Sequence, residues 1–245
     1  MGIWFWFLMA FIAFGFITIV RKWHDYAILF TIAIGFAINA NIFNSFSTPI
    51  SWGSFIFSID SILYTGFTFT VIICAKEYGI RKAKILASST IAAILLSAVI
   101  EFLAKISSFG YSVETLNTLF GYIFSALGTF AAIWIMLPIF RKLEESNVNI
   151  NINFVICVLI ASIINTSIFY GFTMLTNGVA DNLMAILVGS YIGKIFCILL
   201  GQTSYYINTH IFIPNSLKDK YKPIWQKMEK GLDEEKKQTT KNIEK

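Results

Sequence analysis

Residues 187–201, LVGSYIGKIFCILLG, form an apolar stretch with a single lysine, Lys194, near its middle. The stretch belongs to a longer apolar segment, residues 183–212, which is long enough to cross a lipid bilayer as a helix. A lysine at the centre of such a helix costs roughly 2.5–3.5 kcal/mol on insertion scales. Two interpretations follow. In the first, the Lys194 side chain lies along the helix and its ammonium group reaches a membrane interface. In the second, the side chain faces a cavity in which it holds a substrate or a counter-ion.

The composition indicates a membrane protein. The chain has 245 residues, of which 56% are hydrophobic and 13% are charged, and its mean hydropathy is +0.69. Soluble domains carry about 25% charged residues. The fold class expected is therefore all-α, a polytopic helical bundle whose main partner is the lipid bilayer.

Motifs of soluble enzymes are missing from the sequence. It contains no GxGxxG, P-loop or HExxH pattern, only two histidines, and three cysteines without CxxC spacing. We therefore expect small cysteines in the core rather than a disulfide framework. No metal site, cofactor, nucleic-acid partner or enzymatic activity is expected.

Apolar segments of about 20 residues recur along the chain, as spanning helices require. Residues 1–213 are expected to form the transmembrane bundle, and residues 214–245 a basic cytoplasmic tail, amphipathic at its start and disordered past Gly231. The seven segments expected to span the membrane are residues 2–20, 26–44, 54–75, 85–106, 117–140, 153–175 and 183–212.

The distribution of lysine and arginine predicts the orientation. Basic residues follow the first, third, fifth and seventh segments, as in KEYGIRKAK (residues 76–84), whereas the loops after the second and sixth carry none. The first segment lacks a basic n-region and is expected to be a retained helix. The chain is thus expected to be a multi-pass protein of the cell membrane, with its N-terminus outside and its C-terminus in the cytoplasm.

Polar side chains inside the expected spans are candidates for a site, because lipid makes them costly. Aromatic side chains near the outer end suit a planar ligand, although an interfacial belt also explains them. The candidate substrate-binding residues are Asn39, Asn41, Trp52, Phe57, Asp60, Asn165, Tyr170 and Lys194.

The position of Lys194 favours a polar pocket. It lies about eleven residues from the outer end of its segment, too far for easy escape to the interface. Asp60 and Asn165 are expected at similar or somewhat outer depths. The alternative is a purely structural pairing of Lys194 with Asp60 or with Glu101, although Glu101 also has Lys105 four residues on.

Four ordered stretches resemble the VUT family of vitamin uptake transporters, which includes the queuosine-precursor transporters. They are INAN (38–41) at the end of the second segment, WGSFIF (52–57) opening the next helix, KEYGIRKAK (76–84), and SIINTSIF (162–169) followed by SYIGK (190–194). The resemblance implies a helical-bundle importer of 7-deazaguanine bases. The family positions that it carries over are Asn41, Trp52, Glu77, Gly79, Asn165 and Lys194.

The chain departs from the family at three carboxylates. Asn165 stands for an aspartate, Ile73 or Cys74 for a second, and an acidic position within residues 133–140 is apolar. These losses are consistent with a changed substrate, altered ion coupling or lost transport, and Asp60 offers a partial replacement.

Two functional classes follow. The leading one is a transporter importing a small planar nitrogen heterocycle, a queuosine precursor or vitamin-like compound, either autonomously or as the substrate-binding subunit served by a partner ATPase. The alternative is a non-transporting membrane sensor or interaction module. An intramembrane enzyme would need a nucleophile paired with a base or a metal cluster, and the sequence offers neither.

Overall fold

The computed structural model describes residues 3–21, 26–46, 50–57, 59–110, 112–177 and 183–207. These residues form seven α-helices and one β-hairpin, which confirms the all-α class. The expected tail, residues 214–245, lies outside the described residues. The elements are α1 (Ile3–Arg21), α2 (Tyr26–Phe46), β1 (Ile50–Trp52), β2 (Phe55–Phe57), α3 (Ile59–Tyr78), α4 (Ile80–Phe109), α5 (Val113–Glu145), α6 (Ile150–Asn177) and α7 (Leu183–Ile207).

Within the described ranges, five helices, α3 to α7, are long and apolar enough to cross a membrane. The chain is therefore a multi-pass membrane protein. In α1 and α2 the apolar stretches are shorter, Ile3–Ile17 and Tyr26–Ala40. The expectation of seven spans thus stays a prediction for these two helices.

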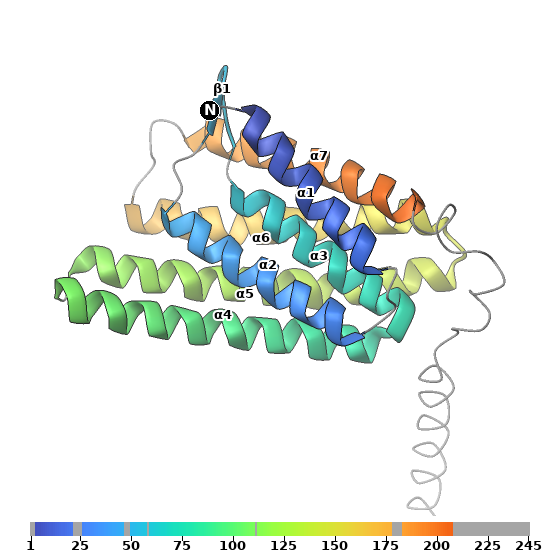
Figure 1. Cartoon of the computed structure of the whole chain (residues 1–245), viewed down its shortest axis with the longest axis horizontal. Helices are drawn as coiled ribbons and strands as arrows, with labels where there is room; N and C mark the ends of the chain where they lie inside the picture. Colours follow the sequence, from blue (N-terminus) through green and yellow to red (C-terminus); the bar gives the residue numbers. More distant parts are fainter. Residues whose placement is uncertain are drawn as a thin grey trace, which may run out of the picture.

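Successive helices run in alternating directions through the bundle (Figure 1). The C-terminal ends of α1, α3 and α5 and the N-terminal ends of α2, α4 and α6 consequently lie at one end of the bundle. Contacts tie this end together: Lys76 at the end of α3 forms a salt bridge with Glu144 at the end of α5, and the Tyr26 hydroxyl donates to the Lys82 carbonyl oxygen. The basic residues around the α3–α4 and α5–α6 turns, both predicted to be cytoplasmic, therefore lie on the same side of the bundle.

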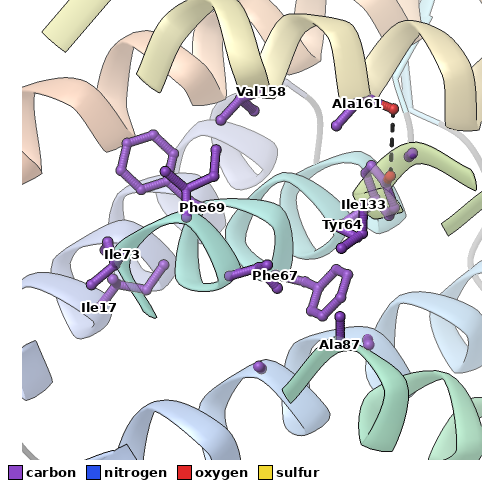
Figure 2. Packing of buried hydrophobic residues seen from close by; sticks show 14 of the residues in the cluster. Ile17, Tyr64, Phe67, Phe69, Ile73, Ala87, Ile133, Val158 and Ala161 are labelled. Atoms are coloured by element: carbon purple, nitrogen blue, oxygen red, sulfur yellow. Dashed lines mark hydrogen bonds between the residues drawn. The ribbon is translucent and has the colours of Figure 1, made fainter. Parts of the chain in front are cut away.

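Helix α3 is the centre of the bundle and packs against all six other helices. Every side chain from Ser61 to Ala75 is buried. Figure 2 shows Phe67 and Phe69 among side chains from neighbouring helices, and the Tyr64 hydroxyl donating to the Ala161 carbonyl oxygen of α6 at 3.5 Å. Cys74, Cys157 and Cys197 are buried and form no disulfide, as expected for small core residues.

Hydroxyl groups on α3 are accommodated without water. Thr65, Thr68 and Thr70 each donate to the backbone carbonyl oxygen four residues earlier. Such bonds satisfy the hydroxyl inside its own helix, so α3 can be polar in sequence and still fully enclosed by apolar neighbours.

The β-hairpin corrects one expectation from the sequence. A helix was expected from residue 54, with WGSFIF opening it, but Ile50–Trp52 pairs antiparallel with Phe55–Phe57, and α3 begins at Ile59. Gly53 has φ 58°, while Ser54 is not among the residues with positive φ. This combination is that of a type II′ turn, in which glycine occupies the first central position.

The long α4 and α5 helices extend past the predicted apolar segments at both ends. Expected at 85–106 and 117–140, they run over 30 and 33 residues. At about 1.5 Å per residue each is longer than a hydrocarbon core of about 30 Å, so each is long enough to reach into both interfaces. Hydropathy located the apolar centres and missed these polar ends.

A buried amide ties α5 to α6. Asn153 is 0% exposed, its Nδ2 donates to the Phe140 carbonyl oxygen at 3.0 Å, and its Oδ1 accepts from the Cys157 thiol at 3.2 Å. We expect Asn153→Ala to lower the free energy of unfolding by about 1 kcal/mol, the scale of interhelical hydrogen bonds in membranes. Thermal unfolding in detergent measures this, with Cys157→Ala as the control that keeps the bond to Phe140. Equal stability of Asn153→Ala and the native chain would contradict the assignment.

A buried polar cavity between α3, α5, α6 and α7

A small cavity lies between α3 and five of the helices that surround it, α2, α4, α5, α6 and α7. Its volume is about 30 Å³, counted as space for the centres of water-sized molecules. This space is enough for a few waters. The lining residues are Ala37, Ala40, Asp60, Tyr64, Phe67, Ile94, Ser125, Thr129, Asn165, Thr166, Phe169, Tyr170, Ser190 and Lys194.

Lys194 is fully enclosed at the middle of α7. It is 4% exposed, so it does not extend to a membrane interface. Its Nζ donates to Thr166 Oγ1 at 2.5 Å and lies 5.0 Å from the centre of the Tyr64 ring. The amine is thus stabilised by a hydroxyl and an aromatic face, and not by direct contact with a carboxylate. Two of its three N–H donors have no hydrogen-bond acceptor among the described residues.

Asp60 contributes the carboxylate of the cavity from the first turn of α3. Its Oδ1 is buried and has no hydrogen-bond partner within the described part of the chain. Asp60 and Lys194 are close enough for their charges to interact, but they form no salt bridge. The positive end of the α3 dipole helps to stabilise a carboxylate at this place.

Helices α5 and α6 meet at an amide. Asn165 is 7% exposed and its Nδ2 donates to Thr129 Oγ1 at 3.3 Å, while the Thr129 hydroxyl donates to the Ser125 carbonyl oxygen at 2.7 Å. A Cβ at Gly128 would lie 3.2 Å from Asn165 Nδ2, so the absence of a side chain there permits this approach.

The β-hairpin packs on α7 next to the cavity. Ser61 and Ser190 hydroxyls lie 3.3 Å apart and join α3 to α7. One residue earlier, a Cβ at Gly189 would overlap the carbonyl oxygen of Ile56 and lie 2.7 Å from its carbonyl carbon. Glycine at position 189, in the stretch GSYIG (189–193), therefore allows the close approach of a hairpin that was not predicted from the sequence.

Four of the eight candidate residues are brought together by the fold: Asp60, Asn165, Tyr170 and Lys194 line one cavity. Asn39 does not line it. Its side chain is exposed, and its Nδ2 donates to the Gly35 carbonyl oxygen of its own helix at 2.7 Å. The side chain of Asn41 lies outside the described residues.

The two aromatic candidates of the hairpin also lie outside the cavity lining. Trp52 is 54% exposed, which suits the interfacial belt. Phe57 is buried, with its ring centre 5.5 Å from that of Trp6 and 6.2 Å from that of Trp52. Phe57 therefore anchors the hairpin against α1.

Three other residues discussed from the sequence, Glu101, Glu77 and Gly79, do not line the cavity. Glu101 forms a salt bridge with Lys105 at 2.9 Å and accepts from the Tyr122 hydroxyl, so it does not pair with Lys194. Glu77 belongs to the last turn of α3. Gly79 follows with φ 87°, a conformation that favours glycine, and allows α3 to turn directly into α4.

Three residues that were not predicted from the sequence complete the site. Thr166 accepts the lysine hydrogen bond, Tyr64 supplies its aromatic face, and Thr129 holds Asn165. Thr166 adjoins Asn165 in SIINTSIF, and Tyr64 stands four residues after Asp60 on the same helix face. Hydroxyl and tyrosine side chains are too common in membrane helices to be singled out from sequence alone.

Within the described residues no group of three or more His, Cys, Asp and Glu side chains could hold a metal ion. The polar groups of the cavity are instead hydrogen-bond donors and acceptors surrounded by aromatic rings, an arrangement suited to binding a small polar molecule. No family model, no curated protein and no solved structure matches this chain.

Proposed function

We propose that this protein is a membrane transporter that imports a small planar nitrogen heterocycle, a queuosine precursor or a vitamin-like compound. The observation that carries the proposal is the buried cavity in which Lys194, Asp60 and Asn165, from three different helices, face one space. Buried ionisable groups are costly in a membrane bundle and are typical of substrate pathways. The aromatic side chains beside them, such as Tyr64 and Phe169, offer flat apolar faces for a ring.

The size of the cavity bears on the transport cycle. Room for a few waters is too little for a bicyclic ring, so we take the described conformation to be a closed state of the proposed carrier. Substrate entry then requires helices around α3 to separate, which is the movement that alternating access demands. Helix α7 and the hairpin packed on it are the elements that we propose to move.

We also propose that the carrier works without a docked ATPase. A partner would dock at the basic corner between α3 and α4, residues 76–84, where Arg81 is exposed but the other three cations contact their own chain. Lys76 bridges to Glu144, Lys82 lies 5.2 Å from the Tyr26 ring centre, and Lys84 lies 5.9 Å from that of Trp134. These contacts suggest that the basic residues set the orientation of the chain in the membrane and stabilise the bundle.

The proposed location is the cell membrane, with the α1–α2, α3–α4 and α5–α6 connections and the C-terminus in the cytoplasm. We expect green fluorescent protein fused after Lys245 to fluoresce, and alkaline phosphatase fused there to be inactive. Fusions in the α6–α7 connection, after residue 180, are expected to give the opposite pair of signals. An active phosphatase at the C-terminus would contradict this orientation.

The function is tested in cells that can neither make nor import queuosine precursors. We expect the full chain, supplied with 7-cyano-7-deazaguanine, 7-aminomethyl-7-deazaguanine or queuine at low concentration, to restore queuosine in tRNA. An empty vector gives the baseline, and membrane expression is measured alongside. A chain that is well expressed and behaves like the empty vector with all three bases would exclude import of queuosine precursors. Binding of a base without any accumulation would favour a sensor.

A further inference from the structure

The two charges of the cavity are opposite in sign, and within the part of the chain that the structure describes neither is neutralised by a salt bridge. The Lys194 amine is bonded to the neutral hydroxyl of Thr166, and Oδ1 of Asp60 has no hydrogen-bond partner among the described residues. The nearest other polar groups are already committed to each other, as in the Asn165–Thr129 and Ser61–Ser190 contacts. Among the described residues of the cavity, an anionic acceptor and a cationic donor therefore retain unsatisfied hydrogen-bonding capacity.

This pair constrains what can bind between its members. An anionic ligand would compensate Lys194 and leave Asp60 facing a like charge, while a cationic ligand would do the reverse. Either arrangement leaves a buried charge uncompensated, which is expensive away from water. A neutral ligand avoids the penalty if it offers an N–H donor to the carboxylate and, beside it, a carbonyl acceptor to the ammonium.

Aromatic walls restrict the shape of such a ligand. Tyr64, Phe67, Phe169 and Tyr170 line the cavity together with the two charges. A flat ring with both hydrogen-bonding groups on one edge satisfies the walls and the charges at once. A flexible zwitterion could balance the charges but would leave the rings without a partner.

We infer that Asp60 and Lys194 act together as a charge-balanced pair that selects electrically neutral, planar ligands with an N–H donor next to a carbonyl acceptor. The inference rests on the proposed function, because it concerns the substrate of the same cavity. Asp60 and Lys194 determine specificity by sign of charge: removing one makes the site prefer ligands that carry the missing sign. Removing both restores a preference for neutral ligands at lower affinity.

Three probes share one bicyclic ring and differ in charge: 7-cyano-7-deazaguanine is neutral, 7-aminomethyl-7-deazaguanine is a cation, and 7-carboxy-7-deazaguanine is an anion. Equilibrium binding of each is measured on the purified full chain in lipid nanodiscs. The proteins are the native chain, Asp60→Asn, Lys194→Gln and the double variant. Glu101→Gln and Lys105→Gln serve as matched controls, since their salt bridge lies outside the cavity.

We expect the native chain and both controls to bind the neutral probe most tightly. In Asp60→Asn the affinity ratio of the anionic to the neutral probe should rise about tenfold, and in Lys194→Gln the ratio of the cationic to the neutral probe should rise by a similar factor. The double variant should return both ratios to near the native values, because coupled groups deviate from additivity.

Two results separate the inference from the proposed function. If the native chain binds the neutral probe and the variants lose all three probes in equal proportion, the two charges have a structural role and only the inference fails. If the folded native chain binds none of the probes, the proposed substrate class fails and the inference with it. Thermal unfolding of each variant identifies those that are misfolded, and Asp60→Glu, which retains the charge, should retain the native ratios.

Discussion

Replacing Lys194 by methionine is expected to reduce uptake of the substrate strongly while making the bundle more stable. The amine is 4% exposed and held by a single hydrogen bond to Thr166, without a salt bridge among the described residues. An apolar side chain of similar length avoids the cost of burying this group, and Asp60, which forms no salt bridge with Lys194, loses only a longer-range attraction, so the free energy of unfolding should rise. Loss of a charge-assisted hydrogen bond to substrate costs about 1.5–3 kcal/mol, or roughly 10- to 100-fold in affinity.

The opposite signs of these two effects distinguish a binding lysine from a structural one. Uptake is measured as substrate accumulated per amount of inserted protein, and stability as the unfolding temperature in the same detergent. Lys105→Met is the matched control: it loses a salt bridge to Glu101 and should leave uptake unchanged. A Lys194→Met protein that unfolds more easily and transports normally would show that Lys194 only supports the fold.

A second large effect is expected at Gly189. Gly189→Ala should detach the β-hairpin from α7, because the added Cβ would overlap the backbone of Ile56 and lie 2.8 Å from its nitrogen. Backbone atoms cannot yield as a side chain tip can, so we expect a destabilisation of about 3 kcal/mol, the upper part of the range for overpacking. Trp52 belongs to the hairpin, and the buried Trp6 packs against Phe57 of the hairpin. Tryptophan fluorescence during unfolding therefore reports the loss of stability.

Gly171→Ala makes the same substitution at a helical glycine that has open space around it. It should be neutral or stabilising by about 0.5–1 kcal/mol, since alanine favours the helix. If both variants unfold like the native chain, the hairpin does not rest against α7 as described. If both are equally destabilised, the effect is not specific to the hairpin contact.

The helices were predictable because lipid imposes one rule over the whole chain. Apolar runs of about 20 residues must become helices, and the segments around Lys194 and Asn165 were located within a few residues. The hairpin was missed because hydropathy does not separate a strand from a helix in a run as short as FIF. Its signal is local: Gly53–Ser54 between two short apolar strands is a pattern of two-residue hairpin turns.

The site was predictable only in part. Charged and amide groups deep in apolar segments are costly enough to stand out, and Asp60, Asn165 and Lys194 do share a cavity. Asn39 shares that cost in sequence, but its amide is satisfied by the carbonyl of Gly35 within the same turn of helix. Depth along a segment does not reveal the direction in which a side chain points, and this is what separates Asn39 from Asn165.

The enclosure of α3 has a consequence for how the protein is made. This helix has the lowest mean hydropathy of the five candidate spans. Yet 89% of the residues in its most apolar 18-residue stretch are buried inside the bundle, against 33–44% for the other four helices. A ribosome releases α3 before α4 to α7 exist, so its threonines and Asp60 first meet lipid rather than protein. Stable residence of α3 in the bilayer then depends on helices synthesised later. Substitutions in those helices that weaken their packing against α3 would therefore reduce the amount of protein in the membrane, even where they leave the substrate preference unchanged.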